Sequence, residues 1–244
     1  MRRFVGVQYG IMLIVFGVVA WRGGEIGIFE DPNFRAAIGT TIVVAVLVVL
    51  LNLVVANYVG YYLARVTGRK LAFLDVCLQL PLIVPLLVIA AGLDIWFIRM
   101  DLTETVLGVV LIQLLPTLPY SIRIARNAYL ALDQDMNQYV YLMGGTRWRL
   151  VLDVYLPLMR PMNETILLFA VVISIGQYAI TSMIGGGIIQ TVALVLFPYF
   201  ASSQLQVVAA AALFTIFMAF AMLFLFRWMY KGMVKLVGVM DEWR

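Results

Sequence analysis

Residues 36–64 read AAIGTTIVVAVLVVLLNLVVANYVGYYLA, an apolar run without one charged side chain. A helix of about 20 apolar residues crosses the hydrocarbon core of a bilayer, so this run is long enough to span it. The chain of 244 residues is 64% hydrophobic and 12% charged, whereas soluble domains are roughly 45–50% apolar and about 25% charged. These proportions exclude an ordinary soluble domain, a disordered chain and a nucleic-acid-binding domain. They predict an all-α integral membrane protein.

Five further apolar runs are long enough to be considered as spans. They cover residues 4–21, 71–97, 105–125, 165–184 and 207–230. Run 4–21 follows two arginines and resembles a signal peptide, but we interpret it as an uncleaved anchor. Pro81 and Pro85 are expected to kink or interrupt run 71–97. Residues 188–200 are too few to cross, and they predict a short element near the outer surface.

Basic residues give the predicted orientation of these six spans. Fourteen of the 17 Lys and Arg residues fall in segments on the side of the N-terminus, and only Arg22, Arg35 and Arg99 fall on the other side. Cytoplasmic loops of membrane proteins carry this excess, so both termini are expected in the cytoplasm. Five or seven spans would place the basic C-terminal segment outside.

The residue types that are missing exclude several kinds of chemistry. The chain has no histidine and one cysteine, Cys77, which excludes histidine-based catalysis, histidine metal sites, an intrachain disulfide and paired-cysteine sites. We therefore expect no catalytic residue and no metal ligand. Asp75 and Asp94 lie near the two ends of run 71–97, so no span carries the mid-bilayer charge that an ion-coupled carrier needs.

The inner loop at residues 127–161 has a pattern of its own. Leu132, Met136, Tyr139, Val140 and Met143 recur at helical spacing, as do Trp148, Val151, Leu152 and Tyr155 further on. Gly144 and Gly145 between the two sets favour a turn. The loop therefore predicts two short amphipathic helices. They either lie on the inner leaflet or dock in a groove of a cytoplasmic partner.

The same loop resembles the EAA loop of binding-protein-dependent ABC importer permeases. In that family a Glu-Ala-Ala triplet, a glycine, an aliphatic residue and Leu-Pro follow at fixed spacing. Here Gly144, Val154 and Leu156-Pro157 occupy the later positions, while Gln138-Tyr139-Val140 replaces the triplet. The resemblance implies contact with an ATPase for the following residues. They are Met136, Gln138, Tyr139, Val140, Met143, Gly144, Gly145, Thr146, Arg147 and Trp148.

This resemblance extends over most of the chain and implies a type I importer with the MetI-like fold. Residues 1–33 would be an anchor and outer loop, 34–230 the permease domain and 231–244 a cytoplasmic tail. The family implies a second permease that is a homologue or a copy, two ABC ATPase subunits, and an extracytoplasmic binding protein. It also implies location in a bacterial inner membrane. The chain has no phosphate-binding loop motif, so ATP and Mg²⁺ are expected on the ATPases.

The region from residue 173 to 198 is similar to permeases of the polyamine, thiamine and iron uptake group. This implies a small organic cation such as polyamine or thiamine as cargo, with iron, sulfate or molybdate, or another small solute as alternatives. Outside this class, an ion-coupled secondary carrier or a membrane scaffold stays open.

Polar side chains within the spans are the candidate pathway residues. Ser174, Gln177, Tyr178 and Thr181 recur at helical spacing in run 165–184 and so are expected to share one face, and Gln113 is a further candidate. Such a stripe faces either a pathway or a neighbouring helix. Gly185, Gly186 and Gly187 follow on the outer side, where the importer interpretation implies contact with the binding protein and the alternative is a plain tight turn.

Overall fold

The computed structural model of the protein describes residues 31–132, 135–200 and 205–236. Every regular element within these ranges is a helix, which confirms the all-α class. Three helices there are long and apolar enough to cross a membrane, and two sharply bent helix pairs raise the number to five if each pair is one span. The run 4–21 and the end of the tail, 237–244, lie outside the described residues, so six spans stay a prediction.

Three of the predicted runs form single long helices. These are α2 (Pro32–Leu63), α5 (Val106–Leu130) and α12 (Leu205–Leu236). The start of α2 is capped by the Asp31 carboxylate, which accepts a hydrogen bond from the backbone N–H of Asn33 at 2.8 Å. Pro116 and Pro119 lie inside α5 without ending it, because neighbouring groups in a helical membrane bundle tolerate proline.

The run 71–97 is interrupted, as its prolines predict. It forms α3 (Arg69–Ile83) and α4 (Leu86–Arg99), whose axes differ by 100°. The interruption is at Pro85, while Pro81 stays inside α3. Val84 adopts an extended conformation with ψ of 136°, because a residue before proline is disfavoured in the helical region.

The prediction of one continuous helix over 165–184 is wrong. The chain forms α9 (Arg160–Ile175) and α10 (Ala179–Gly185), with a break from Gly176 to Tyr178. Gly176 caps the end of α9 with φ of −81°, and glycine is a poor residue for a helix interior, which favours an end at this position. The high hydropathy of the run concealed this break.

The short outer element predicted at 188–200 is a helix, α11 (Val192–Phe200). Its first backbone N–H, on Val192, donates to the Thr41 hydroxyl oxygen of α2 at 2.8 Å. The start of α11 is therefore capped by a side chain from another helix.

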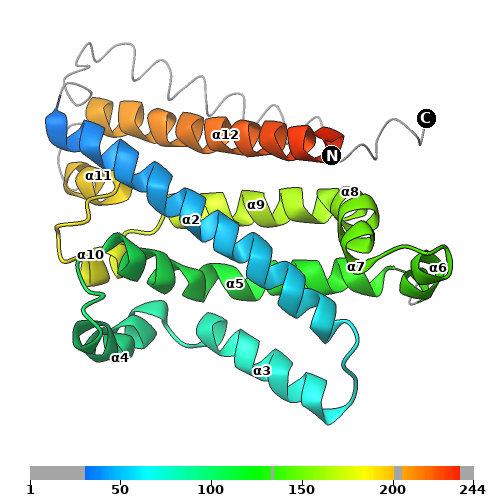
Figure 1. Ribbon diagram of the computed structural model, residues 1–244. Coiled ribbons are helices and arrows are strands. Elements are labelled where there is room, and N and C mark those ends of the chain that lie inside the picture. Colours follow the sequence, from blue (N-terminus) through cyan, green and yellow to red (C-terminus); the bar gives the residue numbers. More distant parts are fainter. Residues whose placement is uncertain (1–30, 133–134, 201–204, 237–244) are drawn as a thin grey trace, which may run out of the picture.

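Helix α2 crosses over α5 and α9 through the middle of the molecule (Figure 1). At one crossing the backbones approach so closely that a Cβ atom on Gly60 would lie 2.5 Å from the Cβ of Ala125. A small residue is required there. Buried apolar side chains of α2, α9, α11 and α12 fill the largest core cluster, among them Phe34, Val49, Val171, Leu196 and Met218.

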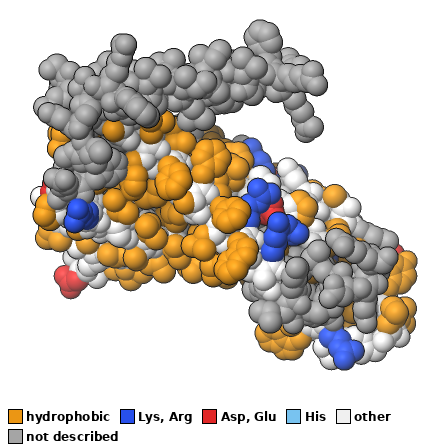
Figure 2. Space-filling view, turned by 90° about the horizontal axis from the view of Figure 1, so that it is seen from above, with side chains coloured by type: hydrophobic (Ala, Val, Ile, Leu, Met, Phe, Trp, Pro, Cys, Tyr) orange, Lys and Arg blue, Asp and Glu red, His pale blue; other side chains and the backbone are white. Residues whose placement is uncertain are grey.

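Much of the remaining surface is apolar. Seen from above, hydrophobic side chains cover most of the described face, with charged side chains in a few isolated places (Figure 2). No residue of α3 is buried, and Phe73 and Ile83 on this helix are 69% and 72% exposed. Such a surface is suited to lipid or to another membrane chain rather than to water.

The two ends of the bundle carry different short helices. At one end lie α4, α10 and α11, and at the other end lie α6 (Met136–Leu142), α7 (Arg147–Arg149) and α8 (Leu156–Leu158) (Figure 1). A π-helical segment, η2 (Leu150–Tyr155), joins α7 to α8. The two short helical stretches predicted within residues 127–161 are therefore present.

Candidate functional site

A glycine turn joins α6 to α7. Gly144 has φ of +78°, and its N–H donates to the Tyr141 carbonyl at 3.0 Å, while the N–H of Gly145 donates to the Val140 carbonyl at 2.8 Å. These two bonds form a Schellman motif, which satisfies the last carbonyls of a helix and requires a left-handed residue. A Cβ atom on Gly145 would lie 2.6 Å from Cγ1 of Val140. Each glycine is thus required for a different reason.

The second helical stretch begins directly after this turn. The Thr146 hydroxyl accepts a hydrogen bond from the backbone N–H of Arg149 at 3.4 Å, and the Thr146 carbonyl accepts one from Leu150 at 3.0 Å. This is the position and residue type of a helix N-cap. The turn and the cap together set the direction in which α7 leaves α6.

The side of the α6–α7 pair that faces away from the bundle is strongly exposed and apolar. Leu142 is 83% exposed, Met143 88%, Trp148 76% and Tyr139 56%. Val140, on the opposite side, packs against a second buried cluster, which includes Ala125, Leu150 and Tyr155. Large apolar side chains held in the open by a defined turn are typical of a docking surface rather than of a solvated loop.

Gln138, at the first position of the expected Glu-Ala-Ala triplet, is exposed. Its amide donates to the carboxylate of Asp135 at 3.1 Å. A carboxylate therefore lies beside the position where the family pattern has glutamate. Met136, which starts α6, is half-buried.

Three tyrosine rings attach the helix pair to the bundle. Tyr155 of η2 meets Tyr61 of α2 and Tyr129 of α5 edge to face, with ring centroids 5.7 Å apart in both cases. The guanidinium of Arg65 lies 3.5 Å above the Tyr61 ring centroid. Buried aromatic pairs in this geometry add stability beyond their apolar contact.

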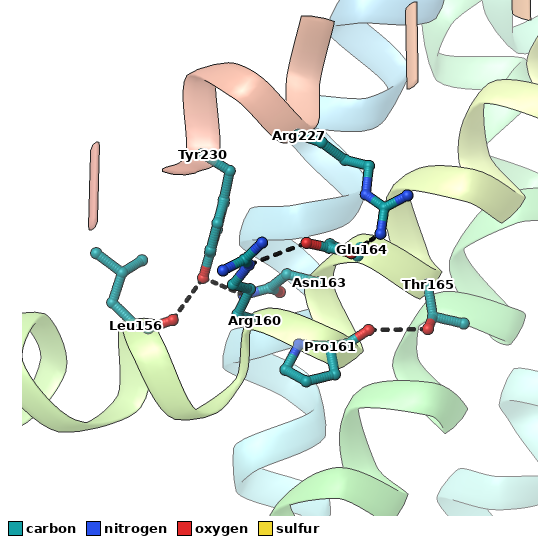
Figure 3. A network of polar contacts seen from close by, with 8 residues as sticks. All are labelled: Leu156, Arg160, Pro161, Asn163, Glu164, Thr165, Arg227 and Tyr230. Carbon is teal, nitrogen blue, oxygen red and sulfur yellow. Dashed lines mark hydrogen bonds and ion pairs between the residues drawn. The ribbon is translucent and has the colours of Figure 1, made fainter. Parts of the chain in front are cut away.

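Polar side chains continue this attachment beyond the rings (Figure 3). The Tyr230 hydroxyl donates to the Leu156 carbonyl at 2.6 Å and accepts from the Asn163 amide at 3.1 Å. The Asn163 side-chain oxygen accepts from Asn57 at 2.8 Å, and the Asn57 oxygen accepts from the Tyr129 hydroxyl at 2.8 Å. The series joins α12, α9, α2 and α5 to Leu156, near the end of residues 136–158, which we call the docking segment.

Ion pairs lie next to this series. Glu164 pairs with Arg160 at 3.0 Å on its own helix and with Arg227 of α12. The sequence pattern does not single out Asn57, Asn163 or Tyr230 as functional residues. The local signal for them is weak, since each is one polar residue near the end of an apolar helix.

The predicted pathway residues are only partly brought together. Gln113 is fully buried in α5, where its amide oxygen accepts from Ser174 at 2.6 Å and its nitrogen donates to Thr181 at 2.9 Å. Ser174 and Thr181 are on opposite sides of the break between α9 and α10. Gln177 and Tyr178 lie within the break, so the single polar face is not formed.

Tyr178 is instead half-buried and stacks on Phe197 of α11, with ring centroids 3.8 Å apart. The hydrogen bonds of Gln113 to Ser174 and Thr181 thus link α5 to α9 and α10. This is the contact with a neighbouring helix that was the alternative to a pathway.

The glycine turn at Gly186 and Gly187, predicted on the outer side, packs against the loop before α5. Gly186 and Gly187 have φ of +56° and +79°, and a Cβ atom on Gly186 would lie 2.6 Å from the Glu104 side chain. The backbone N–H of Glu104 donates to the Ile184 carbonyl at 2.8 Å. Gly185 is buried, whereas Gly186 and Gly187 are exposed at the end opposite to α6.

Known proteins show similarity to most of the chain. Residues 56–235 match the family described as "Binding-protein-dependent transport system inner membrane component". The molybdate/tungstate transport system permease protein WtpB of Thermococcus kodakarensis is 26% identical over 132 residues, which are 54% of this chain and 53% of that protein.

The molybdenum transport system permease proteins ModB of Escherichia coli and Azotobacter vinelandii are similar as well. They are 29% and 26% identical, over 63% of this chain in both cases and over 72% and 74% of their own lengths. The chain spans about half the length of the WtpB proteins that it matches.

Proposed function

Because this chain belongs to the family of binding-protein-dependent transport system inner membrane components, we propose that it is the permease half of a type I ABC importer. The observation that carries the proposal is the helix pair α6–α7, which presents Leu142, Met143 and Trp148 at 76–88% exposure around a fixed glycine turn. An amphipathic helix of this kind fits a hydrophobic groove of a partner. In this assignment the partner is a cytoplasmic ATPase, and this chain is not itself an enzyme.

The proposed mechanism transmits movement from the ATPases to the spans. Two ATPase subunits bind ATP and Mg²⁺, and their closure displaces the docked helix pair. Tyr155, buried between Tyr61 and Tyr129, passes this displacement to α2 and α5. Packed elements move as units because a close-packed interior does not deform smoothly.

The remaining partners follow from the same assignment. A second permease, a homologue or a copy of this chain, completes the substrate pathway within the bilayer. The surface of α3, which buries none of its residues, is available to lipid or to that second chain. An extracytoplasmic binding protein docks at the opposite end, near Gly185–Gly187. Both termini lie in the cytoplasm of a cell whose inner membrane holds the complex.

The proposed cargo is a tetrahedral oxyanion such as molybdate or tungstate. The relatives described above are permeases of molybdate, tungstate or molybdenum by their names. Polyamine or thiamine, the cargo expected from the sequence, finds no support among these relatives. Molybdate, one of the alternative cargoes expected from the sequence, is therefore the cargo that we propose.

The test is reconstitution of the permease with its ATPase and binding protein in liposomes. Uptake of molybdate that requires ATP supports the proposal, and ATP-independent uptake by the single chain contradicts it. Trp148→Ala should remove an exposed docking side chain and reduce co-purification of the ATPase. Trp228→Ala is the matched control, since Trp228 is 67% exposed on α12 and should leave co-purification unchanged.

A further inference from the structure

The chain bends sharply where the docking segment enters the bundle. The axis of residues 150–158 differs from that of α9 by 65°, and we refer to this bend, residues 156–160, as the elbow. The Leu156 carbonyl lies at the elbow and accepts a hydrogen bond from the Tyr230 hydroxyl at 2.6 Å (Figure 3). A side chain of the last helix thus contacts the backbone of the elbow directly.

Tyr230 has a second contact on the other side of the bend. Asn163, in the first turns of α9, donates from its amide to the Tyr230 oxygen at 3.1 Å. One hydroxyl therefore bonds to both arms of the elbow, as donor to one and acceptor to the other. Because hydrogen bonds depend steeply on angle, this arrangement restricts the angle between the two arms.

An ion pair repeats the link one helical turn earlier on α12. Arg227 is three residues before Tyr230, so the two side chains lie on one face of the helix. Arg227 pairs with Glu164, which also pairs with Arg160 at the elbow. Arg227 and Tyr230, one helical turn apart on α12, are thus both bonded to the first turn of α9.

The described apolar contacts of α12 are of a different kind. Its buried side chains include Met218 and Met222, and methionine adapts its shape to its surroundings. Phe217 and Phe224 are 69% and 74% exposed on its outer side. Apolar contacts of this kind are non-directional, whereas the polar bonds of Tyr230 and Arg227 depend on distance and angle.

We propose that Tyr230 is a positioning residue that ties α12 to the elbow, so that displacement of the α6–α7 pair moves α9 and α12 together. The inference rests on the proposed function, because it concerns how the docked segment transmits movement. Without the hydroxyl, the arms of the elbow change their angle independently. ATP hydrolysis then continues while less cargo is moved for each ATP.

The test measures molybdate uptake and ATP hydrolysis on the same reconstituted complex. Tyr230→Phe removes the hydroxyl and keeps the ring, and the loss of its two hydrogen bonds should lower the ratio of uptake to hydrolysis at least about five-fold. Hydrolysis and the KM for molybdate should stay near the wild-type values. Tyr58→Phe is the matched control, because Tyr58 is 80% exposed. Hydrogen exchange of the amides at residues 156–163 should become about five-fold faster in Tyr230→Phe only.

Two results would overturn the inference. One is a Tyr230→Phe complex that equals Tyr58→Phe in its uptake-to-hydrolysis ratio, and the other is a parallel loss of both activities, which indicates a merely structural role. If Tyr230→Phe does not assemble, Arg227→Gln should lower the ratio and Arg227→Lys should largely restore it, while equal ratios refute the tie. A wild-type complex without molybdate uptake refutes the cargo proposal alone. Hydrogen exchange needs no cargo, so unchanged exchange in Tyr230→Phe then still refutes the tie.

Discussion

Substitution of the turn glycines should weaken ATPase binding in a pattern that only the observed turn explains. Gly144 has φ of +78°, and a Cβ atom there would have no neighbour within 4 Å. The cost of Gly144→Ala is therefore purely conformational, and a left-handed L-residue costs roughly 1–2 kcal/mol. Since about 1.4 kcal/mol is tenfold in affinity, ATPase binding should weaken about 5- to 30-fold.

Asparagine and the neighbouring glycine separate this explanation from simple crowding. Asparagine tolerates the left-handed region, so Gly144→Asn should stay within about three-fold of the wild type. Gly145→Ala should weaken binding at least as much as Gly144→Ala, because its Cβ atom would lie 2.6 Å from Val140 Cγ1 and 2.8 Å from the Val140 oxygen. Gly92→Ala is the matched control, since a Cβ atom on Gly92 also has no neighbour within 4 Å and the position lies inside α4.

The measurement is the Kd of the purified ATPase for each detergent-solubilised permease variant, with thermal unfolding as the test of folding. The reasoning is refuted if Gly144→Ala binds like the wild type. It is equally refuted if Gly144→Asn binds as weakly as Gly144→Ala, because backbone conformation would then not be the cause.

Two further substitutions test the polar cluster around Gln113 and the glycine turn at Gly186. Gln113→Leu removes two buried hydrogen bonds, each worth about 0.6 kcal/mol in membrane proteins, so the free energy of unfolding in mixed micelles should fall by about 1–2 kcal/mol. Gln138→Leu is the control, because Gln138 is exposed and its replacement should change this free energy little. Equal effects of the two substitutions would contradict the role assigned to Gln113. Gly186→Ala places a methyl group 2.6 Å from the Glu104 side chain at φ of +56°, so hydrogen exchange in residues 101–105 should accelerate about ten-fold. An unchanged exchange rate there would show that the turn does not hold this loop.

The long helices and the docking turn could be predicted because their signals are local. Uncharged runs such as 36–64 exceed the thickness of a bilayer, and two adjacent glycines between amphipathic stretches end one helix and begin another. The position of Pro85 likewise anticipated the break before α4. These features depend on residues that are close together in the chain.

The break at Gly176 and the polar series at Tyr230 depend on distant partners. Run 165–184 is apolar enough to be taken as one helix. Gln113, which is distant in the sequence, bonds to Ser174 of α9 and to Thr181 of α10, and so holds the two separate helices together. Asn57 and Asn163 are 106 residues apart, and Asn163 and Tyr230 are 67 apart. No periodicity within a single helix connects such residues, so their roles required the tertiary structure.

The cap of α11 has a consequence for biogenesis. The Thr41 hydroxyl that accepts from Val192 belongs to a residue 151 positions earlier in the chain. A nascent chain emerges from its N-terminus, so the acceptor is synthesised long before the N–H that needs it. Helix α11 is nine residues long, and so short a helix is marginal by itself. We therefore expect the first turn of α11 to form after α2, which supplies the acceptor for its first N–H.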